Sequence, residues 1–75
     1  MTDSLNTTDQ WVIAAPGVIV LPTTGYEIRL NPENGKFRAY RCGKPIGAAE
    51  EHTLTMVKLV VRDHMRDLLA VGIEP

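Results

Sequence analysis

Three consecutive pieces of the chain decide the fold: Tyr26-Glu-Ile-Arg-Leu30, Asn31-Pro-Glu-Asn-Gly35 and Lys36-Phe-Arg-Ala-Tyr-Arg41. The first and third pieces alternate apolar with polar side chains, which is the period of a β-strand with one buried face. Between them, Pro32 suits a type I turn and Gly35 suits the left-handed residue that closes it. The three pieces together predict a β-hairpin.

Towards the C-terminus the apolar period becomes helical, from Ala48 to about Val71. The apolar positions recur every three or four residues and are Leu54, Val57, Val61, Met65 and Leu68. Two starts remain open for this helix, because Thr53 is a rival N-cap within the stretch. Gly72 is a natural residue to follow its last turn. The pattern predicts one amphipathic C-terminal helix.

Towards the N-terminus two short β-branched runs, residues 11–15 and 18–21, flank Pro16–Gly17. Runs of this length predict strands, and a hairpin and one bent strand both fit them. A further turn is expected over residues 43–47. The order of strands followed by a helix predicts an α+β fold, with an antiparallel sheet of three to four strands packed on the helix. We expect a flexible tail over residues 1–10 and a single domain over residues 11–75.

The alternation assigns side chains to the two faces of the sheet. The face towards the helix is expected to carry the apolar side chains of Tyr26, Ile28, Leu30, Phe37 and Ala39. The opposite face is expected to carry Glu27, Arg29, Lys36, Arg38 and Tyr40.

Positive charge is concentrated around the hairpin, although the chain of 75 residues has a net charge of −1. Residues 26–47 hold five basic side chains and two acidic ones, a balance of +3. Arginine binds phosphate or carboxylate, and tyrosine offers a flat ring for stacking. The candidate binding residues are therefore Arg29, Lys36, Arg38, Tyr40, Arg41 and Lys44. The alternative interpretation is an ordinary solvated strand face.

Catalytic and metal-binding patterns are weak in this sequence, so we expect no enzyme, no cofactor and no metal site. One cysteine, Cys42, allows neither an internal disulfide nor a cysteine-based zinc site. His52 and His64 lie about 120° apart around the helix by its 3.6-residue period, so they cannot share one metal. His64 falls in the apolar stripe, where we expect a half-buried, hydrogen-bonded ring.

The apolar run from Trp11 to Leu21 is broken by Pro16–Gly17 and is too short for a membrane span. The residues before it include Asp3 and Asp9 and no basic residue, unlike a secretory signal. The expected location is the cytoplasm, which agrees with a free thiol.

Three apolar residues, Met56, Leu59 and Leu69, fall outside the core stripe of the helix. Exposed apolar groups on a very small domain indicate a partner, and a homodimer through the helix would bury them. The alternatives are scattered surface residues and, for Met56, a place under the N-terminal strands.

The pieces Tyr26-Glu-Ile-Arg, Asn34-Gly-Lys-Phe-Arg-Ala-Tyr-Arg41 and Gly43-Lys-Pro-Ile-Gly47, followed by a helix, resemble the arm-type DNA-binding domains of phage integrases and the related AP2-like domains. These domains pack a three-stranded sheet on one helix and insert the sheet into the major groove of DNA. The resemblance covers about residues 18–70. It implies groove-facing roles for Arg29, Arg38 and Tyr40, and phosphate contacts for Lys36, Arg41 and Lys44.

A looser likeness is to small accessory proteins of phages and mobile elements, such as anti-CRISPR proteins, which act by occupying a site on a larger protein. The net charge of −1 favours a protein partner over DNA, because DNA-binding domains carry a basic excess. The sequence therefore predicts a small binding module that uses its basic hairpin face. Sequence-specific DNA binding by the same face is the alternative.

Overall fold

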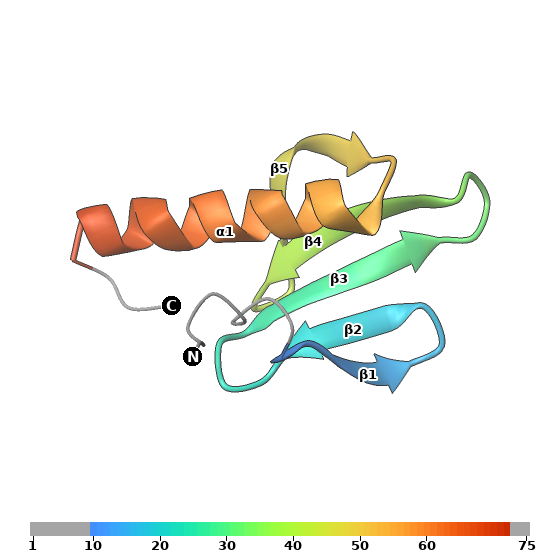
Figure 1. The fold of residues 1–75 in the computed structure, drawn as a ribbon, viewed down its shortest axis with the longest axis horizontal. Helices are drawn as coiled ribbons and strands as arrows, with labels where there is room; N and C mark the ends of the chain where they lie inside the picture. The colour runs from blue at the N-terminus through green and yellow to red at the C-terminus, as the bar shows by residue number, and fades with distance from the viewer. Residues whose placement is uncertain (1–9, 73–75) are drawn as a thin grey trace.

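The computed structural model describes residues 10–72, which form one sheet and one helix (Figure 1). The elements are β1 (Val12–Ala15), β2 (Val18–Leu21), β3 (Tyr26–Asn31), β4 (Lys36–Arg41), β5 (Lys44–Glu51) and α1 (Leu54–Ala70). The predicted tail lies outside the described residues except for Gln10, and residues 73–75 of the predicted domain lie outside them too.

All neighbouring strands pair antiparallel, and the order across the sheet is β1-β2-β3-β4-β5. The sheet is thus a meander in which each strand pairs with the next along the chain. The α+β class is confirmed, but the expected three to four strands are five. Residues 11–21 resolve into a hairpin and not a bent strand, with Val12 opposite Val20.

The additional strand is β5, which occupies residues that we expected to form a turn and the first turn of the helix. The chain reverses at Cys42–Gly43 instead, where both residues have positive φ, of 51° and 85°. Two consecutive left-handed residues are the geometry of a type I′ hairpin, whose twist matches that of the flanking strands. Lys44 consequently pairs with Arg41 across a tight turn and continues the sheet.

The helix begins later than the periodicity indicated, because Thr53 is its N-cap. The hydroxyl of Thr53 accepts a hydrogen bond from the backbone N–H of Met56 at 3.1 Å. This bond satisfies one of the free N–H groups of the first turn. Residues 48–51 belong to β5, in which Glu51 pairs with Phe37 of β4, and the rival start is the correct one.

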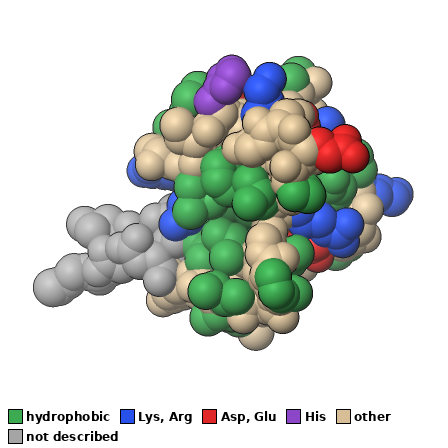
Figure 2. All heavy atoms as spheres, turned by 90° about the vertical axis from the view of Figure 1, so that its right-hand side faces the viewer, with side chains coloured by type: hydrophobic (Ala, Val, Ile, Leu, Met, Phe, Trp, Pro, Cys, Tyr) green, Lys and Arg blue, Asp and Glu red, His purple; other side chains and the backbone are tan. Residues whose placement is uncertain are grey.

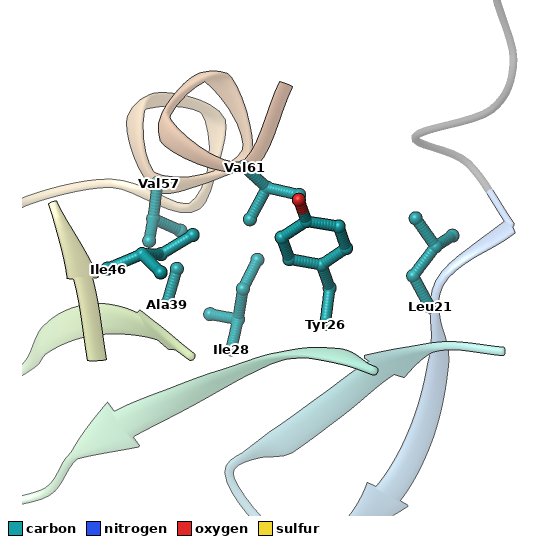
Figure 3. Close-up of a cluster of buried hydrophobic side chains, with 7 residues drawn as sticks. All are labelled: Leu21, Tyr26, Ile28, Ala39, Ile46, Val57 and Val61. Atoms are coloured by element: carbon teal, nitrogen blue, oxygen red, sulfur yellow. The ribbon is translucent and has the colours of Figure 1, made fainter. Parts of the chain in front are cut away.

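The core lies between α1 and the middle of the sheet (Figure 3). Tyr26, Ile28 and Ala39 rise from the strands and meet Val57 and Val61, which descend from the helix. Each of these five side chains is at most 2% exposed. Their positions confirm the face that the alternation assigned to the core.

The helix covers only part of the sheet, since its main contacts are with β3, β4 and β5. Leu30, which we expected beneath the helix, is 38% exposed because it lies near the end of β3, beside the turn at Gly17. Its backbone N–H donates to the carbonyl of Gly17 at 2.8 Å. Among residues 10–72, no helix has the length and apolar character needed to cross a membrane.

Candidate binding surface

The candidate surface is the side of the sheet opposite the helix, called here the outer face. Cross-strand partners share a face of a sheet, and the register pairs Glu27 with Tyr40 and Arg29 with Arg38. Lys36 continues the same row opposite Asn31. The outer face therefore brings together four of the six predicted binding residues: Arg29, Lys36, Arg38 and Tyr40.

Three side chains form a connected cluster at the centre of the outer face. The guanidinium carbon of Arg29 lies 4.7 Å from the ring centroid of Tyr40, within the range of a cation–π contact. The Nε of Arg29 also donates a hydrogen bond to the carboxylate of Glu27. The side chain of Arg29 nevertheless stays 51% exposed, so it is held in place and still accessible.

Arg38 is fixed differently from Arg29, by the backbone of β5. Its guanidinium donates to the carbonyl of Gly47 at 3.0 Å and to that of Ile46 at 3.4 Å. The β4–β5 register shifts between Phe37 and Ala39, so Arg38 satisfies carbonyls beside an irregularity in the ladder. Part of its role is therefore structural.

Arg41 and Lys44 do not belong to the outer face. The register places Arg41 opposite Tyr26, which points into the core, and Lys44 opposite Arg41. The guanidinium carbon of Arg41 lies 5.4 Å from the centroid of the Tyr26 ring. The six predicted residues are consequently divided between the two sides of the sheet, four on one and two on the other.

The β3–β4 turn is attached to β5 through the carboxylate of Glu50. The side-chain amide of Asn34 donates to this carboxylate at 2.9 Å, and that of Asn31 donates at 3.2 Å. These two hydrogen bonds hold the pKa of Glu50 below its usual range, because they stabilise the charged form. This contact fixes the β3–β4 turn, which is one end of the hairpin that carries the outer face.

At the other end of the sheet, the hydroxyl of Tyr26 and Nδ1 of His64 lie at hydrogen-bond distance, 2.8 Å. The two rings meet edge to face, with centroids 5.7 Å apart. Burial raises the pKa of Tyr26, and the charge of Arg41 opposes that change. The expected half-buried, hydrogen-bonded His64 is confirmed, and it joins α1 to β3.

The outer face carries guanidinium, aromatic and carboxylate groups, which are those of a binding surface. In the described part of the chain, His, Cys, Asp and Glu side chains form no group of three that could hold a metal ion. Cys42 is exposed at the β4–β5 turn. The arrangement of Arg29, Tyr40 and Glu27 can bind a carboxylate, a phosphate or a flat apolar group.

The three apolar helix residues are exposed as expected: Met56 by 47%, Leu59 by 48% and Leu69 by 59%. Leu59 and Leu69 are ten positions apart, which corresponds to about 80° around the axis and about 15 Å along it. Arg66, which forms an ion pair with Asp63, lies between them by the same period. Leu69 is therefore separated from Leu59, whereas Met56 lies one turn from Leu59 on the helix surface.

A second surface, which the sequence reasoning missed, lies on the helix side of the sheet beyond the start of α1. It is an apolar groove of about 280 Å³. Its lining comes from the β1–β2 hairpin, the middle strands and the first residue of the helix, and includes Ile13, Ile19, Leu30, Phe37 and Leu54. Figure 2 shows hydrophobic side chains gathered at this end of the molecule. We call it the hairpin groove.

No protein-family model, no curated protein and no solved structure matched this chain.

Proposed function

We propose that this protein is a small non-enzymatic binding module that docks on a protein partner through its outer face. In this proposal it acts like the accessory regulators of phages and mobile elements, by occupying a site on a larger protein. The observation that carries the proposal is the exposed Arg29 guanidinium, held by the Tyr40 ring and the Glu27 carboxylate. Arginine and tyrosine are among the residues that are enriched at the energetic centre of protein interfaces.

Preorganisation supports this function. A flexible arginine side chain loses rotamer freedom on binding, which opposes association. Here Arg29 is already held on two sides, and Arg38 is anchored to the carbonyls of Ile46 and Gly47. The outer face thus presents two ordered guanidinium groups, which suit a carboxylate-bearing surface on the partner.

The charge of the outer face favours protein over DNA. Three cations, Arg29, Lys36 and Arg38, stand against two carboxylates, those of Glu27 and Glu50, a balance of three minus two, or +1. Arg41 and Lys44, which a phosphate-binding row would need, belong to the other side of the sheet. DNA-binding interfaces, by contrast, are strongly positive.

Pull-down experiments with matched variants test the proposal. Immobilised wild-type protein, Arg29→Ala and Tyr40→Ala are incubated with lysate of the source cells, and captured proteins are quantified by mass spectrometry. Arg62→Ala is the control, because Arg62 is an exposed arginine of α1. We expect a protein that wild type and Arg62→Ala capture and the two outer-face variants lose. The proposal requires the same ranking when the captured protein is purified and titrated.

A parallel titration of labelled duplex DNA at about 50 and 200 mM salt tests the alternative. Saturable binding that weakens with salt and depends on Arg29 would replace the protein partner with DNA. Equal capture by all four proteins would remove the outer face as the binding surface.

A further inference from the structure

We propose that a second copy of this chain covers the hairpin groove, so that the protein forms a two-fold symmetric dimer through its β1–β2 hairpins. This inference concerns the opposite side of the sheet from the outer face and does not depend on the proposed function. It starts from the incomplete cover of the sheet by α1, whose main contacts reach only as far as β3.

Large apolar side chains around the groove are exposed to solvent. Ile13 is 81% exposed and Leu30 is 38% exposed, although both line the groove. Three further apolar side chains of the lining are half-buried and come from separate elements: Ile19, Phe37 and Leu54. A continuous apolar surface of this kind marks an interaction site.

The absence of charge around the groove favours a second copy as the occupant. Residues 10–26, which include the whole β1–β2 hairpin, contain no charged side chain, and neither does the lining of the groove. A surface of this kind offers nothing that a charged partner could recognise. It can, however, face an identical surface without repulsion between like charges. The net charge of −1 also adds little repulsion between two chains.

A two-fold contact needs a patch that is complementary to itself. The hairpin groove meets this condition, because Ile13 projects from the edge strand beside a recess framed by Leu30 and Leu54. In a symmetric pair, Ile13 of each copy can enter the recess of the other. The hairpin of one copy then lies beside α1 of its partner, over the part of the sheet that the helix leaves open.

The small core gives the dimer an energetic basis. In residues 10–72 the buried hydrophobic core consists of seven side chains: Leu21, Tyr26, Ile28, Ala39, Ile46, Val57 and Val61. Chains of this size bury a smaller fraction of their unfolded surface than larger domains do, and association is a common way to bury more. A standard interface of about 800 Å² on each copy would cover about a sixth of the 5030 Å² of accessible surface.

Sedimentation equilibrium and light scattering over about 5–500 μM protein test the dimer, since this range covers weak and moderate homodimers. Wild-type protein is expected to change from monomer mass towards dimer mass as the concentration rises. Ile13→Glu should weaken the dimer at least about tenfold, because it places an unpaired carboxylate in an apolar contact. Leu69→Glu, the same type of change at an exposed helix position, should leave the dimer unchanged.

Ala15→Lys is a second variant at the groove, since Ala15 is exposed and also lines it. It tests the dimer independently if Ile13→Glu fails to give the wild-type circular dichroism spectrum at low concentration. Wild-type protein that stays monomeric over the whole range overturns the inference. So does a dimer that both folded groove variants retain, or one that Leu69→Glu abolishes.

Discussion

The hydrogen bond between Tyr26 and His64 allows a quantitative test of what joins the helix to the sheet. Tyr26→Phe removes one hydroxyl from a side chain that is 1% exposed and keeps the buried ring. The lost hydrogen bond contributes about 1 kcal/mol. His64 is half-buried, so water can reach its ring and limit the loss to about 0.5–1.5 kcal/mol. For a domain of this size, 1 kcal/mol corresponds to a melting temperature lower by about 4–8 °C.

Urea unfolding followed by the fluorescence of Trp11 measures this change, because the chain has one tryptophan and it packs against the core. Tyr40→Phe is the matched control on the outer face and should change stability by less than about 0.5 kcal/mol. A double-mutant cycle with His64→Ala separates the bond from general packing. The assignment fails if Tyr26→Phe unfolds like wild type, or if the coupling energy between the two sites is near zero.

Two further predictions concern the glycines of two turns and the loss of stability at acidic pH. Gly25→Ala should destabilise the protein more than Gly35→Ala in the same urea assay. Both glycines have positive φ. A Cβ at Gly25 would lie 2.8 Å from Sγ of Cys42, whereas a Cβ at Gly35 would have no atom within 4 Å. We expect about 1 kcal/mol from strain alone at Gly35 and more at Gly25, and equal losses would contradict the contact. The pKa of Glu50 is lower in the folded protein than the value of about 4.5 in the unfolded chain, so the charged carboxylate stabilises the fold above that pH. This stabilisation is lost as the pH falls through the pKa of the folded state. Glu50→Gln should therefore lose less stability than wild type between pH 6 and 3, and parallel curves would show that the carboxylate does not contribute.

The central hairpin is predictable from the sequence because its determinants are local. Alternation over residues 26–41 fixes which side chains face the helix, and Gly35 adopts the left-handed conformation that the turn required, with φ of 71°. The hydroxyl of Thr53 likewise sets the start of α1 within three residues of itself. In each case the sequence contains both partners of the interaction within a few positions.

The strand β5 was missed because tertiary pairing overrides its local preferences. Ala48, Ala49, Glu50 and Glu51 favour a helix by composition, yet Glu51 is paired with Phe37 of β4. Proline also disfavours the interior of a sheet, but Pro45 lies in β5, an edge of the sheet, where proline is tolerated. The deciding interaction is the pairing with β4, where Phe37 lies opposite Glu51, and composition alone does not include it.

The candidate binding surface was likewise predictable only in part. Arg29, Arg38 and Tyr40 were grouped correctly by alternation. The same period, applied to the end of β4, places Arg41 with Ala39 on the helix side, so the signal that separates it was present in the sequence. The hairpin groove is different, because its existence depends on how far α1 reaches across the sheet. The uncharged stretch of residues 10–26 was its only trace in the sequence.

The two proposed surfaces lie on opposite sides of one sheet, so a partner on one leaves the other accessible. A dimer through the hairpin groove would carry two copies of the outer face, and a partner with two matching sites would gain affinity from their linkage. Arg29→Ala should then remove partner capture and leave the dimer intact. Ile13→Glu should break the dimer and weaken capture only through lost avidity. Each variant thus tests its own surface, and a variant that removed both properties would place dimer and partner on one shared site.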